Sequence, residues 1–422
     1  MQVKISFLGG AAEVGRSSYL VDIGEKFLLD HGVKLGPIKT EYPSVVRTNL
    51  NAIILSHAHL DHSGNLPHLF DYLRSLVFMT PPTLELSRLL WFDSIKIADR
   101  EGKPPKFTKK EIERLEKFVF PTNYNRRLQL TENVSMEFYD AGHIMGAAMT
   151  KLEFKDKVLV YTGDLKVEET RLFPGADINS IGKVDYLIME CCYGDRDHTP
   201  RKKEEKRFAE KVKEIMDNNG IALIPAFAIG RSQELVEILY EYKIEPVFFD
   251  GMGQKAARIM FNFPEYLKDK KYLQKALDNA FWVENRKMRK EALKQPCAIV
   301  TTAGMLTGGT VYEYLPKLYK DKNSGILLTG FQVPDTPGRI LLEHKRIKLN
   351  GSDVKVNCYV ERFDFSAHAG RSGLIKTTKK LQPEKIILVH GDGDVMHKFA
   401  DYLREEEGFV VYTPKNDETI AL

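Results

Sequence analysis

The sequence predicts an α/β protein in which one domain is inserted into another. Short strands and tight turns dominate the first half, whereas apolar strands alternate with amphipathic helices from about Gly194, and the strand-and-turn pattern returns after Gly351. A chain of 422 residues is also long enough to bury two hydrophobic cores. We therefore expect one domain from residues 1–194 and 351–422, and an inserted domain from residues 195–350.

The first half consists mainly of short strands separated by turn residues. Apolar and β-branched residues predict strands over Gln2 to Leu8, Ser18 to Ile23, Lys26 to Leu29, Ala52 to Leu55, Ser135 to Tyr139, Ala148 to Phe154, Lys157 to Tyr161 and Tyr186 to Met189. Helical spacing of apolar residues predicts helices over Leu66 to Leu76 and Pro82 to Ala98. A strand-rich layer with interspersed helices follows from this order.

The inserted segment alternates helices with strongly apolar strands. We expect helices over Arg201 to Asn218 and Ser232 to Tyr242, and strands over Ile221 to Pro225, Pro246 to Asp250, Ala298 to Thr302 and Gly325 to Leu328. Such alternation is typical of a Rossmann-like parallel sheet covered on both faces. The strands expected over Val354 to Val360 and Lys385 to Val389 would then rejoin the first domain.

Composition narrows the class of protein. No apolar run approaches the roughly 20 residues of a membrane-spanning helix, and the N-terminus lacks the regions of a signal peptide. We therefore expect a cytoplasmic protein with no membrane partner. The net charge of +4 neither requires nor excludes nucleic acid. Cys191, Cys192, Cys297 and Cys358 lack metal-ligand spacing, so we expect them to be buried small side chains.

A dense run of metal-binding side chains follows the expected strand at Ala52 to Leu55. Within Ser56-His57-Ala58-His59-Leu60-Asp61-His62, the alternation of an extended chain lets His57 and His59 bind one ion. Asp61 and His62 follow where the chain turns, and can reach a second ion. A lone histidine is more often a core or surface residue, but this many polar groups packed closely without an ion would compete for partners. The run predicts a paired-metal site.

Further ligand candidates stand alone, each at the end of an expected strand. They are His143 in Ala141-Gly142-His143, Asp164 in Gly163-Asp164 and His390 in Val389-His390-Gly391. The neighbouring glycines allow close approach of the backbone. Together with the dense run, these residues supply enough ligands for two zinc ions of four or five ligands each.

The whole chain resembles the β-CASP nucleases of the metallo-β-lactamase fold. Seven motifs carry the resemblance, in the family's order: Asp30 in Leu29-Asp30-His31-Gly32, the run His57 to His62, His143, Asp164, Glu190 in Met189-Glu190-Cys191-Cys192, His368 in Phe365-Ser366-Ala367-His368, and His390. The resemblance implies an αββα sandwich with an inserted Rossmann-like β-CASP domain. Two departures, Cys191-Cys192 for Ser-Thr and Asp392 for Glu, remove no ligand.

The resemblance also implies roles for these residues. The first zinc ion would be held by His57, His59, His143 and Asp164, and the second by Asp61, His62, Asp164 and His390. Besides Asp61, the expected catalytic group includes His368 as general acid, Glu190 as the carboxylate that orients it, and Asp30, which would hold a ligand histidine in its correct tautomer. A turn residue before Gly32 is the alternative interpretation of Asp30.

The substrate implied by the resemblance is RNA. RNA-acting members carry a histidine where DNA-acting members usually carry valine, and His390 has that place. The Phe-Ser-Ala-His form resembles the cleavage and polyadenylation specificity factor branch, in its short archaeal type. We expect a zinc-dependent endonuclease, 5′–3′ exonuclease or both, acting on single-stranded RNA in 3′-end processing or decay. A homodimer and an RNA-processing complex are further expectations.

Two other functions compete with this interpretation. A metallo-hydrolase of small thioesters or lactones would share the zinc ligands, but it would not need the inserted domain. A non-catalytic scaffold subunit of an RNA-processing complex would be expected to lose ligands, whereas every position is filled. Gly230, Gly304 and Gly308-Gly309 are candidates to cradle phosphates, but glycines in such loops are equally often turn formers.

Overall fold

The structure is a computed structural model that describes residues 2–36 and 39–422. It divides into two compact units, of which the first combines Met1–Asp197 with Ala367–Leu422 and the second is His198–Ser366. The second unit is therefore an insertion within the chain of the first.

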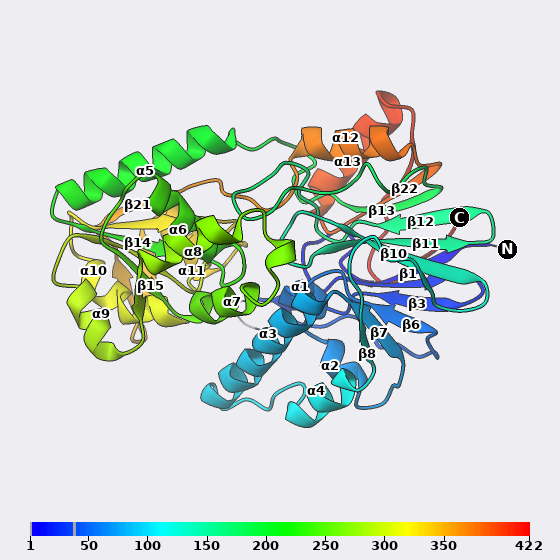
Figure 1. The fold of residues 1–422 in the computed structure, drawn as a ribbon, viewed down its shortest axis with the longest axis horizontal. Coiled ribbons are helices and arrows are strands. Elements are labelled where there is room, and N and C mark those ends of the chain that lie inside the picture. The colour runs from blue at the N-terminus through cyan, green and yellow to red at the C-terminus, as the bar shows by residue number, and fades with distance from the viewer. Residues whose placement is uncertain (1, 37–38) are drawn as a thin grey trace. The chain divides into compact units, whose positions relative to one another are not determined.

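Two seven-stranded sheets form the first unit (Figure 1). The first sheet has the order β24 (Thr419–Ala421), β1 (Lys4–Gly9), β2 (Ser18–Asp22), β3 (Lys26–Leu29), β6 (Ala52–Ile54), β7 (Leu76–Met79) and β8 (Val119–Pro121). The second has the order β23 (Val410–Tyr412), β22 (Lys385–Val389), β13 (Tyr186–Glu190), β12 (Lys157–Tyr161), β11 (Ala148–Phe154), β10 (Val134–Asp140) and β9 (Leu128–Gln129).

Alternating side chains of these strands build two different cores. Ile54 joins Phe138 and Ile188 of the second sheet in a single buried cluster, so the two sheets face each other. The adjacent Ile53 points the other way, into a cluster that includes Trp91. That cluster is covered by α3 (Pro81–Arg100) and α4 (Lys109–Glu116), while α13 (Gly393–Glu405) packs on β22 and β23. This layering confirms the predicted αββα sandwich.

The predicted helix over Leu66 to Leu76 is wrong in its second half. The helix α2 (Leu66–Leu69) ends after one turn, and β7 begins at Leu76. Val77 and its neighbours pair in parallel with β6, and β7 lies between β6 and the edge strand β8. Tertiary pairing therefore overrides the helical spacing of apolar residues here. The remaining elements of this unit are β4 (Lys34–Leu35), β5 (Thr40–Glu41), α1 (Leu60–Ser63) and α12 (Arg371–Leu381).

A parallel six-stranded sheet forms the second unit. Its order is β16 (Phe281–Val283), β15 (Val247–Asp250), β17 (Cys297–Thr301), β14 (Ile221–Pro225), β18 (Gly325–Leu328) and β21 (Tyr359–Arg362). Every residue of β14 and β17 is buried, as expected for strands covered on both faces. The helices are α5 (Arg201–Asp217), α6 (Arg231–Glu241), α7 (Met252–Met260), α8 (Lys270–Asp278), α9 (Arg286–Ala292), α10 (Leu315–Leu318) and α11 (Pro337–His344), with 3-10 turns at Pro264–Tyr266 and Thr310–Glu313.

The second boundary lies later in the chain than the position after residue 350 that the sequence indicated. The hairpin β19 (Arg346–Leu349) and β20 (Ser352–Lys355) follows α11, and β21 then pairs in parallel with β18. The segment expected to rejoin the first domain at Val354 to Val360 thus belongs to the second unit. A strand-like sequence pattern alone does not show which sheet a strand joins.

Across the described residues, none of the helices combines the length and the apolar character needed to span a bilayer.

Candidate metal centre

The first sheet contributes its ligand candidates at one edge. The strands β3 and β6 are parallel neighbours, so the residues that follow them, Asp30 and the run from His57, leave the sheet on the same side. After His59 the chain enters α1, and this turn carries Asp61 and His62 away from the strand direction. His57, His62 and Asp30 are completely buried.

The second sheet contributes the remaining candidates in the same way. The strands β12, β13 and β22 are parallel neighbours, and Asp164, Glu190 and His390 lie at or just beyond their carboxyl ends. His143 lies in the turn between β10 and β11, whose register places Asp140 opposite Ala148 at that end of the sheet. Residues far apart in sequence are thus brought to one edge.

A first ligand group surrounds one oxygen of Asp164. Its Oδ2 lies 3.5 Å from Nε2 of His57 and 3.5 Å from Nε2 of His143. His59 joins them, because its Nδ1 lies 3.0 Å from Nε2 of His143. One potential ligand atom from each of these residues lies within 4.8 Å of all the others.

A second ligand group surrounds the other oxygen of the same carboxylate. Oδ1 of Asp164 lies 3.1 Å from Nε2 of His62 and 3.1 Å from Nδ1 of His390. Asp61 completes the group, with its Oδ2 3.3 Å from Nε2 of His390. The structure therefore brings all seven predicted ligands together, with Asp164 in both groups.

The polar atoms that face the centre fit a metal ion. Among the described residues, the buried atoms without a hydrogen-bond partner include Nε2 of His57, Nε2 of His62, Oδ1 of Asp164 and Nδ1 of His390. Leaving such atoms unsatisfied in a protein interior costs about 1–3 kcal/mol each. Cations held between imidazole nitrogens and a carboxylate would satisfy these atoms, and this donor set is suited to a divalent ion such as zinc.

Asp30 holds the imidazole of His62 on the side away from Asp164. Its Oδ2 lies 2.7 Å from Nδ1 of His62 and also accepts hydrogen bonds from the hydroxyls of Ser56 (2.7 Å) and Tyr161 (2.6 Å). Its Oδ1 accepts from the backbone N–H of Ser56 at 2.7 Å. With Nδ1 engaged, Nε2 of His62 is the nitrogen that faces Asp164. Sequence reasoning missed Ser56 and Tyr161, although Ser56 precedes the histidine run directly.

Glu190 and His368 form a pair beside the centre. Nδ1 of His368 lies 2.9 and 3.1 Å from the two Glu190 oxygens, while Nε2 lies 3.8 Å from Oδ2 of Asp164. Burial disfavours the charged ring, but the carboxylates of Glu190, Asp164 and Asp61 together outweigh this and raise the pKa of His368 to about 9. A protonated ring at neutral pH is the form that a general acid requires.

Contacts to backbone carbonyls also position the side chain of His143 and the backbone of His368. The carbonyl of Ala367 lies 2.8 Å from Nδ1 of His143, which leaves Nε2 of that ring facing Asp164. The ammonium group of Lys166 donates to the carbonyl of His368 at 3.2 Å. Sequence reasoning missed Lys166, since no local pattern marks a lysine that acts through a distant backbone carbonyl.

Three family models match the chain in order. A metallo-beta-lactamase superfamily domain matches residues 20–190, a Beta-Casp domain matches residues 232–341, and a Zn-dependent metallo-hydrolase RNA specificity domain matches residues 353–414. A protein of Methanocaldococcus jannaschii described as probable RNase MJ4 is 38% identical, with all of both chains covered. The chain belongs to the β-CASP family of the metallo-β-lactamase fold.

Other relatives of this β-CASP protein have additional sequence of their own. RNase aCSPSF2 of Saccharolobus solfataricus is 34% identical over all of this chain and 86% of the relative. Transcription termination factor FttA of Methanocaldococcus jannaschii is 35% identical over all of this chain and 72% of the relative. A crystal structure of a protein of unknown function from Enterococcus faecalis shares the fold, with a TM-score of 0.63, 15% identity and both chains fully covered.

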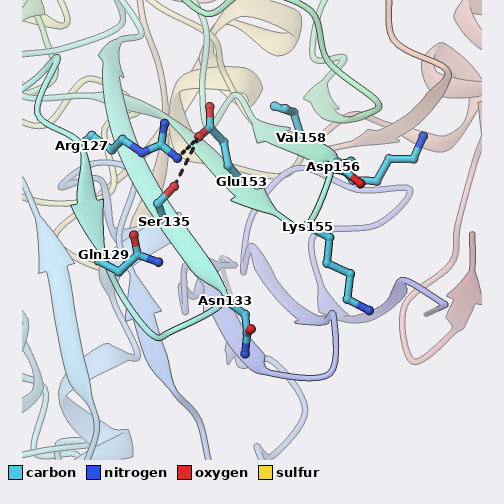
Figure 2. A pocket seen from close by; sticks show the side chains of 9 residues that line it. Arg127, Gln129, Asn133, Ser135, Glu153, Lys155, Asp156 and Val158 are labelled. Atoms are coloured by element: carbon cyan, nitrogen blue, oxygen red, sulfur yellow. Dashed lines mark hydrogen bonds and ion pairs between the residues drawn. The ribbon is translucent and has the colours of Figure 1, made fainter.

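A polar hollow in this β-CASP protein lies away from the metal centre. Figure 2 shows Arg127, Ser135 and Glu153 among its lining residues, with Glu153 2.6 Å from Arg127 and 3.4 Å from Ser135. Ser135 and Glu153 pair near the start of β10 and the end of β11, whereas His143 follows the opposite ends of these strands. The hollow is therefore separated from the ligand groups by the length of the strands.

Proposed function

We propose that this chain is a ribonuclease that hydrolyses phosphodiester bonds of single-stranded RNA with two zinc ions. The observation that carries the proposal is Asp164, whose two oxygens face two separate groups of histidine and aspartate side chains. A carboxylate placed in this way is suited to bridge two ions. The alternative of a non-catalytic scaffold is disfavoured because each group has its full set of ligands.

The ions and the side chains have separate tasks. The two groups that share Asp164 would hold the ions, which would supply activation of a water molecule and neutralisation of charge on the phosphate. Asp30 holds His62 in the tautomer that presents Nε2, and the Ala367 carbonyl does the same for His143. These contacts keep the ligand rings oriented before substrate arrives, which lowers the cost of reorganisation during the reaction.

His368 is the proposed proton donor. Its Nδ1 is held by Glu190, so its Nε2 points towards the centre and lies 3.8 Å from Asp164. Breaking a phosphodiester bond leaves an alkoxide that needs a proton, and the protonated His368 ring would deliver one from Nε2. Glu190 acts as a positioning residue, since its carboxylate contacts His368 and the Leu165 backbone N–H (2.7 Å).

RNA is the proposed substrate on independent grounds. One matching family model is described as an RNA specificity domain, and it spans residues 353–414. Relatives that cover the whole chain are named ribonucleases. A hydrolase of small thioesters would explain neither observation. We propose RNA 3′-end processing or decay as the setting, and a homodimer as the working assembly, which light scattering on the purified protein tests.

The decisive experiment uses single-stranded RNA labelled at either end, incubated with the zinc-loaded protein, with and without a chelator. We expect cleavage that stops with the chelator and returns when zinc is added. Mononucleotides released from the 5′ end would indicate exonuclease action, and discrete internal fragments would indicate endonuclease action. An Asp164→Ala variant serves as the control, because cleavage that persists in it would come from a contaminating nuclease and would refute the proposal.

A further inference from the structure

A third group of ligand atoms lies beside the proposed catalytic pair and includes a thiol. A carboxylate oxygen, a sulfur and two imidazole nitrogens lie within 4.8 Å of one another, from Glu190, Cys192, His368 and His390. Neither ligand group around Asp164 contains sulfur. The sequence alone gave no reason to expect a ligand here, because Cys191 and Cys192 lack metal-ligand spacing.

The fold explains why only one of the two adjacent cysteines enters this group. Glu190 pairs in register with Val389, so the residues after β13 and β22 leave the sheet together. Cys191 is held against β22, where its Sγ lies 3.3 Å from the Val389 carbonyl oxygen. Cys192 is the next residue and remains partly exposed, close to His368 and His390.

We propose an additional, inhibitory site for a thiophilic divalent cation, held by Glu190, Cys192, His368 and His390. A set of one sulfur, two nitrogens and one oxygen suits tetrahedral Zn²⁺ or Cd²⁺, whereas Mg²⁺ prefers oxygen ligands in octahedral geometry. On binding, the thiol of Cys192 releases its proton to solvent and the sulfur coordinates the ion as a thiolate.

Occupation of this site is incompatible with the proposed catalytic arrangement. An ion held by Glu190 and His368 together competes with the hydrogen bond between them, now 2.9 Å long. The same ion would also compete with the second ligand group for the imidazole of His390, which belongs to both groups. The inhibitory effect therefore rests on the proposed function of His368, whereas the binding of the ion does not. Filling of the site therefore requires His390 to leave the second ligand group, which retains Asp61, His62 and Asp164.

The test is a titration of the zinc-loaded protein with Cd²⁺, following the ultraviolet thiolate-to-cadmium absorption and the RNA cleavage rate in parallel. We expect the wild-type protein to gain the absorption with one further equivalent and to lose about 100-fold in rate, since general-acid catalysis contributes at least that much. Each variant is compared with its own rate before Cd²⁺ is added. Cys191→Ser, the matched control, should behave as the wild type, while Cys192→Ser and Cys192→Ala should show neither change.

The same absorption in both Cys192 variants, or the same loss of rate, would overturn the proposal, because Cd²⁺ would then act elsewhere. Inhibition by an equal concentration of Mg²⁺ would refute a site selective for thiophilic ions. If the wild-type protein cleaves no RNA at all, the proposed function fails, but the absorption of Cys192 still decides whether the metal site exists. Circular dichroism of the variants shows that each is folded.

Discussion

Nδ1 of His368 lies 2.9 Å from the carboxylate of Glu190, and this contact directs Nε2 of the ring towards Asp164. Because neither residue belongs to the two ligand groups that share Asp164, proton donation and binding of the two ions should be separable by mutation.

Replacing His368 with alanine should reduce cleavage while leaving the two ions in place. We expect a loss of about 10²- to 10⁴-fold in the single-turnover rate, the usual contribution of a general acid. Elemental analysis of the same preparation measures the zinc content. A variant that has lost zinc together with activity would show that His368 is a ligand instead of a proton donor.

The variants Asp164→Ala and Asp61→Ala should differ in the number of zinc ions that each one loses. Asp164→Ala removes the carboxylate common to both groups, so binding of both ions should weaken strongly. Asp61→Ala affects only the group that contains His62 and His390, so one ion should be retained. Zinc content after dialysis against a weak chelator distinguishes the variants, and equal losses in both would argue against a bridging carboxylate.

Asp30 should influence metal affinity without touching the ion. Asp30→Asn removes the charged acceptor of His62 and should weaken zinc binding about 10- to 100-fold, as is typical of outer partners of ligand histidines. Tyr161→Phe removes one of the hydrogen bonds to Asp30 and should have a smaller effect. Chelator competition measures both affinities; an unchanged affinity in Asp30→Asn would mean that the orientation of His62 does not depend on this carboxylate.

His31 should make the stability of the metal-free protein depend on pH. Burial lowers the pKa of His31 to about 3, and the ring lies between the Ser18 hydroxyl and the Asn65 amide, at 3.0 and 2.8 Å. The folded protein therefore binds fewer protons than the unfolded chain between that value and the ordinary pKa of about 6.5. Stability is fully present above that range and is lost as the pH falls through it, by about 1.4 kcal/mol per pH unit from this group.

Urea unfolding of metal-free wild type and His31→Gln at pH 7.5 and pH 5 measures this contribution. Other titrating groups are shared by the two proteins, so the difference between them isolates His31. We expect the wild type to lose more stability than the variant over this interval. Equal losses would show that His31 is already charged in the folded state.

The sequence predicted the fold class because strand patterns and the alternation of helices with strands are local properties. In this protein the tertiary contacts agree with them. The ligand candidates could be proposed for a related reason, since polar residues directly after buried parallel strands meet at one sheet edge. The sequence could not distinguish a helix from β7 at Leu76, or assign β21 to its sheet, because both depend on pairing with distant strands. The place of Cys192 beside His368 is likewise a product of tertiary structure.

The insertion of the second unit between Asp197 and Ala367 has a consequence for biosynthesis. His390 follows the insertion, and β24 near the end of the chain pairs with β1 near its beginning. During translation the emerging polypeptide therefore holds an incomplete set of ligands until the whole insertion and His390 have been synthesised. A truncated chain that ends before His390 would lack one residue of the second ligand group and should not assemble that ion site.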